Sequence, residues 1–131
     1  MNEMLEALAE ELQTVLPEKW LKVILCAEIS ENCYDIYFYC FIDGVKEAMQ
    51  CYNLESYGIS EEMLDKAFER IYNILMPFWS ESAKTNEWTS CTFSLTPDGS
   101  FNLDLDYTDL VNNCYEYREK WVERYIKSVQ I

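Results

Sequence analysis

The stretch from residue 20 to residue 42, WLKVILCAEISENCYDIYFYCFI, decides the fold of this chain. On both sides of Glu31-Asn32 apolar residues recur at every second position, and β-branched and aromatic side chains are frequent. This period and composition are typical of strands, and a short polar pair between two such runs is typical of a turn. The stretch therefore predicts two antiparallel strands joined at Glu31-Asn32.

The residues that follow continue the sheet. Asp43-Gly44 is a strong hairpin signal, because both residues tolerate the positive φ that tight β-turns require. We expect a third strand over Val45–Cys51. The first half of the sheet is then a three-stranded meander.

The second of these strands is aromatic on both faces. Tyr37 and Tyr39 lie opposite the face that carries Ile36 and Phe38. One interpretation is a central strand that is packed on both sides. The other is an exposed aromatic patch in which Tyr37 and Tyr39 anchor a protein partner, because tyrosine is enriched at interface hot spots. Stacking of nucleic-acid bases would need a basic groove around the rings, and the sequence offers none.

Helical periodicity lies on both sides of this meander. Residues Asn2–Leu16 carry apolar side chains at spacings of three and four, which indicates an amphipathic helix that Pro17 ends. Ser60 is a favourable N-cap for a second helix, since two glutamates follow it. We expect Pro77 to kink or end that helix, and residues 80–87 to form a polar connection.

A second hairpin follows. Residues 90–95 alternate in polarity, and Thr96–Ser100 contains the Pro-Asp-Gly run of a turn. On the return strand one set of side chains is expected to face the core, namely Phe101, Leu103, Leu105 and Tyr107. Asn102, Asp104 and Asp106 are expected to lie outside.

A last helix is expected from Thr108 or Asp109 to Ser128, with an expected buried side of Trp121, Val122, Tyr125, Ile126 and Val129. The resulting order is α-β-β-β-α-β-β-α. Hairpins imply an antiparallel sheet, and helices with one apolar face must cover it. We therefore predict a single α+β domain over residues 1–131, with an antiparallel sheet of about five strands covered by helices.

Charge is the strongest indication of function. The 131 residues hold 24 acidic and 10 basic side chains and no histidine, for a formal charge of −14. Such a chain repels nucleic acid and anionic membranes and attracts basic surfaces. It also lacks the usual acid–base catalyst near neutral pH. Because neither a secretory leader nor an apolar run of about 20 residues is visible, we expect a cytoplasmic protein that binds a basic partner, with no nucleic acid and no membrane involved.

Cysteine usage and motifs indicate that no cofactor or metal is bound. The six cysteines contain no C-x-x-C pair, so in a reducing cytosol they are expected to be small buried apolar residues. Glycine-rich phosphate loops, Ser-His-Asp sets and histidine metal boxes are all absent from the sequence. We therefore expect no catalytic residues, no metal and no cofactor.

Asp104, Asp106 and Asp109 form the tightest acidic cluster. Asp104 and Asp106 share one side of their strand, with side chains about 7 Å apart at the usual strand rise. Three interpretations stay open for the cluster: contacts to a basic partner, a solvated polar face, or a metal-binding or acid–base pair that would make the chain a small enzyme. We assign the three aspartates, with Tyr37 and Tyr39, to partner binding.

The chain resembles, over nearly its whole length, the YezG-like family of bacterial immunity and antitoxin proteins; the first helix, the entry to the first strand at Pro17–Trp20 and the Asp43-Gly44 hairpin fit the layout of that family. The resemblance is carried by Trp88, Thr92-Phe93-Ser94-Leu95, Asp98-Gly99-Ser100-Phe101, Leu105-Asp106-Tyr107-Thr108-Asp109-Leu110, Arg118 and Trp121. It implies a small cytoplasmic protein that binds and neutralises a cognate polymorphic toxin, often a nuclease, by occlusion. No family catalytic residue carries over. Arg118 and Trp121 are expected to be structural, and Arg118 is expected to pair with an acid near Tyr107.

Overall fold

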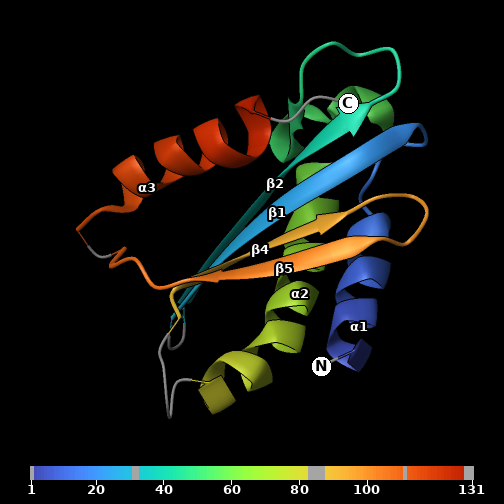
Figure 1. Ribbon diagram of the computed structural model, residues 1–131. Coiled ribbons are helices and arrows are strands. Elements are labelled where there is room, and N and C mark those ends of the chain that lie inside the picture. Colours follow the sequence, from blue (N-terminus) through green and yellow to red (C-terminus); the bar gives the residue numbers. More distant parts are fainter. Residues whose placement is uncertain (1, 31–32, 83–87, 111, 129–131) are drawn as a thin grey trace.

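The computed structural model describes residues 2–30, 33–82, 88–110 and 112–128, and it confirms the α+β class and the predicted order of elements (Figure 1). The helices and strands are α1 (Asn2–Gln13), β1 (Trp20–Ser30), β2 (Cys33–Ile42), β3 (Met49–Gln50), α2 (Glu61–Ser82), β4 (Ser90–Leu95), β5 (Phe101–Asp106) and α3 (Cys114–Trp121). Two 3-10 turns, Cys51–Asn53 and Glu55–Tyr57, precede α2, and a π-helix, Val122–Lys127, continues α3. The predicted turn at Glu31-Asn32 lies outside the described residues.

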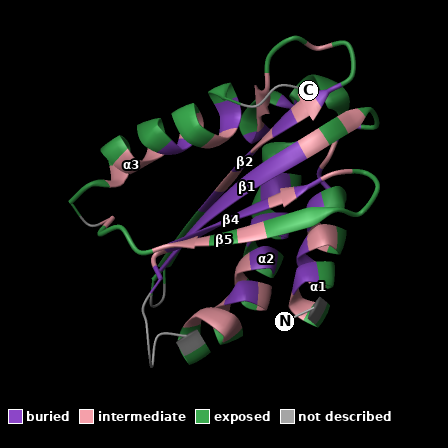
Figure 2. Cartoon of the chain, in the orientation of Figure 1, coloured by how far each residue is buried: buried purple, intermediate pink, exposed green. Residues whose placement is uncertain are grey.

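The predicted hairpin forms the centre of the sheet. All strand pairs are antiparallel, and the strand order is β3-β2-β1-β4-β5. Leu25 in β1 pairs with Phe38 in β2 and with Phe93 in β4. Every residue of β1 from Val23 to Ile29 is buried, because both faces of the sheet are covered (Figure 2).

Helices α1 and α2 cover one face of the sheet and enclose the main core (Figure 1). Their apolar stripes pack on side chains from β1, β2 and β4, including the fully buried Phe38 and Phe93. Full burial of side chains of this size contributes about 1.5–3 kcal/mol each. The backbone N–H of Met63 donates to the Ser60 hydroxyl at 3.2 Å, which confirms the predicted N-cap of α2.

Helix α3 and the π-helix cover the opposite face with a smaller apolar cluster. Its buried members are Ile24, Cys26, Trp121 and Ile126. Of the predicted buried side of the last helix, Val122 and Tyr125 are half-buried and pack against this cluster, and Val129 lies outside the described residues. The interpretation of β2 as a strand packed on both sides is therefore confirmed.

The predicted bounds of the first and last helices were wrong. The first helix ends at Gln13 and not at Leu16, and the last helix begins at Cys114 and not at Thr108 or Asp109. The Asp106 carboxylate accepts hydrogen bonds from the N–H and the hydroxyl of Thr108, at 2.8 and 2.5 Å. Such local hydrogen bonds to a side chain compete with helical hydrogen bonds, so the helix begins further along the chain.

The third strand is shorter than predicted, with β3 limited to Met49–Gln50. The side chain of Gln50 accepts a hydrogen bond from the N–H of Tyr52 at 3.0 Å, which starts a 3-10 turn in place of further strand. Pro77 does not end α2, which continues to Ser82, so residues 80–82 of the predicted polar connection belong to the helix, and residues 83–87 lie outside the described residues. Beyond it, the Trp79 indole donates to the Trp88 carbonyl at 2.8 Å and fixes the last turn against the start of β4.

Two residues expected in the core are exposed. Phe101, at the start of β5, and Tyr107, directly after its end, have 45% and 50% of their surfaces exposed, because β5 is the last strand of the sheet in the described part of the chain. Leu103 and Leu105 are partly buried and do pack on the main core. Among the described residues, no helix has the length and apolar character that crossing a membrane requires.

Candidate functional site

The register of the sheet aligns polar side chains beneath α3. One row across four strands consists of Asp35, Glu28, Ser90 and Asp106. The neighbouring row consists of Tyr37, Cys26, Thr92 and Asp104. Four of the five predicted partner-binding residues therefore lie on the face of the sheet that α3 covers. Tyr37, Asp104 and Asp106 belong to these two rows, and Tyr39 lies one row further along β2.

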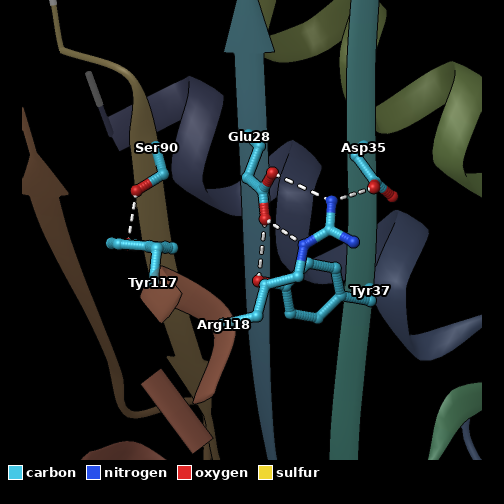
Figure 3. A network of polar contacts seen from close by, with 6 residues as sticks. All are labelled: Glu28, Asp35, Tyr37, Ser90, Tyr117 and Arg118. Atoms are coloured by element: carbon cyan, nitrogen blue, oxygen red, sulfur yellow. Dashed lines mark hydrogen bonds and ion pairs between the residues drawn. The ribbon is translucent and has the colours of Figure 1, made fainter. Parts of the chain in front are cut away.

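An ion pair between a buried carboxylate and a partly exposed guanidinium lies at the centre of this face (Figure 3). Glu28 in β1 is 8% exposed, and both of its carboxylate oxygens accept hydrogen bonds from Arg118 on α3. Nε donates to Oε2 at 2.9 Å and Nη2 donates to Oε1 at 3.0 Å, and Nη2 also donates to Asp35. The hydrogen bonds to Glu28 raise the pKa of Arg118, so its positive charge is retained at any physiological pH.

Tyr37 completes this network. Its hydroxyl donates to Oε2 of Glu28 at 2.9 Å, and the Arg118 guanidinium lies 5.5 Å from the centre of its ring. Burial, followed by the neighbouring Cys26 and Glu28, raises the pKa of the Tyr37 hydroxyl, which keeps it a neutral donor. Tyr37 therefore has a structural role in the free protein, whatever it contacts in a complex.

Three further polar contacts hold α3 and the π-helix to the sheet. The Tyr117 and Ser90 hydroxyls lie 2.5 Å apart (Figure 3), and the buried Trp121 indole donates to the Thr92 hydroxyl at 2.9 Å. The Tyr125 hydroxyl donates to Oδ2 of Asp104 at 3.2 Å. This layer is thus attached by hydrogen bonds as well as by its small apolar cluster.

The two predicted tyrosines and the two strand aspartates do not form one continuous patch. Tyr37 and Tyr39 are half-buried, and their ring centres lie 5.4 and 6.1 Å from that of Trp121. Asp104 lies three strands away from Tyr37, about 14 Å at the usual strand spacing. Helix α3 occupies the space between them. Asp104 is exposed and Asp106 is half-buried.

Asp109 lies instead at a cavity of about 370 Å³ beside the ion pair. The lining includes Glu28, Asp35 and Arg118, together with the apolar surfaces of Tyr34 and Leu110. Three carboxylates against one guanidinium give this lining a net negative charge. Such a cavity suits a basic side chain better than an anion.

The central pair of this site was missed by sequence reasoning. The expectation that Arg118 pairs with an acid near Tyr107 was wrong, because its partners are Glu28 and Asp35. The available signal was a single acid, Glu28, within the apolar run of β1, since a buried carboxylate requires a counter-charge.

The cysteines agree only in part with their predicted burial. Cys26, Cys40, Cys51 and Cys91 are buried, whereas Cys33 is exposed and Cys114 is half-buried. Burial raises the pKa of the Cys51 thiol to about 11 and those of Cys40 and Cys91 to about 12. These three are therefore neutral thiols and not nucleophiles.

The part of the chain that the structure describes contains no group of three or more acids and cysteines placed to hold a metal ion. Within the Asp104 and Asp106 pair, each carboxylate already accepts a hydrogen bond from a neighbouring side chain. The metal-binding interpretation of this pair therefore gains no support.

Comparison with known proteins gives the family. The model of the family described as "Immunity protein YezG-like" matches residues 1–128. The chain belongs to the YezG-like immunity protein family. The predicted resemblance is thereby confirmed over nearly the whole chain.

Named relatives agree with this family. An immunity protein YezG of Bacillus spizizenii is 28% identical over 85% of this chain and 71% of its own length. A type VII secretion system protein, EsaG, of Staphylococcus aureus is 24% identical over 99% of this chain and 96% of its own. The immunity protein YezG of Bacillus subtilis is 22% identical over 85% and 76% of the two chains.

The residues that carry the resemblance to the family are mainly structural. Trp88 and Trp121 are almost completely buried, Trp88 in the main core and Trp121, at the end of α3, in the smaller cluster between α3 and the sheet. Arg118 joins α3 to the sheet, and Asp106 fixes the turn at Thr108. The exposed Asp104 and Asp109 lie close to this framework.

Proposed function

We propose that this chain is an immunity protein that binds a cognate toxin domain in the cytoplasm and neutralises it by occlusion. The observation that carries this proposal is the family match over residues 1–128. The name of the staphylococcal relative supports a toxin delivered by a type VII secretion system. Immunity proteins act as binders, which agrees with the expectation that this chain is not an enzyme.

The charge of the chain supports a basic toxin domain, such as a nuclease with a phosphate-binding cleft. Helices α1 and α2 together hold nine acids and two bases. Both bases are paired within this layer, Lys66 with Glu62 at 3.2 Å and Arg70 with Glu11 at 2.6 Å. The remaining acids create a negative field that accelerates encounter with a basic partner.

The proposed contact residues are Asp104, Asp106, Asp109, Tyr37 and Tyr39. Support comes from their position on or beside the α3 face and from the exposure of Asp104 and Asp109. Asp104 is the best placed to meet a lysine or arginine, because it lies on the outermost strand. The tyrosines would contribute only the part of each ring that Trp121 leaves uncovered.

A matched pair of charge reversals tests this proposal. Asp104→Lys and Glu10→Lys change the net charge equally, but Glu10 lies exposed on α1, in the other layer. Affinity for an inactivated toxin domain encoded beside the gene for this chain is measured by calorimetry. We expect Asp104→Lys to weaken binding at least ten-fold more than Glu10→Lys does. Equal effects would show that the contact surface lies elsewhere, and a wild-type chain that does not bind the toxin would overturn the function.

A further inference from the structure

The edge of the sheet at β5 is a second candidate contact feature. Within the part of the chain that the structure describes, β5 is hydrogen-bonded to β4 on one side and is the last strand of the sheet (Figure 1). Each of its six residues is exposed or half-buried, in contrast to β4 (Figure 2). An edge of this length presents a row of backbone groups that another strand can pair with.

The direction of these backbone groups follows from the β4–β5 ladder. The N–H of Thr96 donates to the carbonyl of Ser100 at 3.0 Å, and the carbonyl of Asp106 accepts from the N–H of Thr89 at 2.8 Å. In an antiparallel pair, hydrogen-bonded and non-hydrogen-bonded residues alternate. The even-numbered residues of β5 therefore direct their backbone groups to β4. Those of Phe101, Leu103 and Leu105 point outward, away from the sheet.

The side chains of β5 indicate what kind of strand would fit. On the α3 face β5 carries Asp104 and Asp106, and on the other face Leu103 and Leu105 pack on the main core. No basic residue occurs in Phe101–Asp106. A strand that alternates basic and apolar side chains would place the basic ones beside the aspartates and extend the core with the apolar ones, since opposite charges on neighbouring strands attract.

A second copy of this chain fits the edge less well than a basic partner. Two copies of β5 would bring aspartates of like charge together, which is destabilising between neighbouring strands. Each copy also has a net charge of −14. The opposite edge of the sheet is interrupted, because β3 pairs with β2 only at Tyr39 and Cys40 and is followed at once by a 3-10 turn that contacts β2.

We infer that the toxin is bound by strand addition: an extended segment with alternating basic and apolar residues pairs with the outward backbone groups of β5. In this binding mode the main-chain hydrogen bonds supply affinity and the alternate side chains supply specificity. This inference rests on the proposed function. It adds the place and the geometry of the contact.

Amide exchange measured by NMR tests the inference on the full chain, free and bound to the inactivated toxin domain encoded beside its gene. We expect exchange at Leu103 and Leu105 to slow at least ten-fold in the complex. Exchange at Asn102 and Asp104 should change little, because their amides are already bonded to β4. If the complex forms and the outward amides keep their free rates, strand addition is wrong and the proposed function stands. If no complex forms, both fail.

A backbone substitution gives a second measurement. Leu103→Pro removes one outward N–H and leaves every donor of the β4–β5 ladder in place. Leu103→Val keeps the outward N–H as well as the ladder. We expect Leu103→Pro to weaken toxin binding at least ten-fold, and Leu103→Val no more than three-fold. Thermal unfolding shows whether each variant is folded. If Leu103→Pro does not fold, the amide exchange of the wild-type complex alone tests strand addition. Equal affinity of the two folded variants would overturn the inference.

Discussion

Arg118 on α3 pairs through two hydrogen bonds with Glu28 in the central strand, a residue 90 positions earlier in the chain. This pair joins the helix of the second half to the hairpin of the first half. The two partners differ in environment, since the Glu28 side chain is 9% exposed and that of Arg118 is 39% exposed. Removal of Arg118 and removal of Glu28 should therefore lower the free energy of unfolding by different amounts.

We expect Arg118→Gln to lower the free energy of unfolding by about 3 kcal/mol, because it leaves the buried carboxylate without its counter-charge. Glu28→Gln should cost less, since Arg118 is partly solvated and keeps its contact with Asp35. Asp35→Asn removes an exposed pair and should cost below about 1 kcal/mol. Urea unfolding at pH 7 measures the three values. A cost for Asp35→Asn equal to that for Arg118→Gln would contradict this order.

The Trp121 indole gives a second test of the α3 layer. Thr92→Val keeps the shape of the side chain but leaves the buried indole N–H without its acceptor, which should cost about 1–3 kcal/mol. Trp121→Phe removes the donor, so adding Thr92→Val to that variant should cost much less. Ser94→Val, half-buried on the same strand and face, is the control and should be close to neutral. Additive effects of Thr92→Val and Trp121→Phe would argue against the hydrogen bond.

The central hairpin and the order of elements could be predicted because they follow from local signals: a period of two, a period near 3.6, and turn residues between them. The Glu28–Arg118 pair could not be predicted, because periodicity does not indicate which face of a sheet a distant helix covers. Burial of Ser90 and Thr92 likewise depends on α3 lying across them. The start of α3 was placed too early because the hydrogen bonds from Thr108 to Asp106 replace helical ones there.

Pro77 is expected to reduce the stability of α2. The helix passes through it, so the carbonyl of Asn73 lacks its helical donor, and the position is exposed. We expect Pro77→Ala to stabilise the protein by about 1–2 kcal/mol, the helical gain less the larger entropy of the unfolded chain. The control Glu69→Ala, exposed on the same helix, should change stability by only a few tenths. Chemical denaturation checks both, and a Pro77→Ala variant no more stable than wild type would contradict the argument.

Alkaline pH should destabilise the protein through its buried thiols. Burial raises the pKa of Cys40 and Cys91 from 9.0 to about 12, so between these values the folded chain retains protons that the unfolded chain loses. Stability from this source is complete below pH 9 and falls as the pH rises toward 12. Each such thiol lowers the free energy of unfolding by up to about 1.4 kcal/mol per pH unit within this window. Urea unfolding between pH 8 and pH 11 should show a shallower decline for Cys91→Ala than for wild type, and an unchanged one for Cys33→Ser, whose thiol is exposed. Parallel declines in Cys91→Ala and wild type would show that other groups control the alkaline loss.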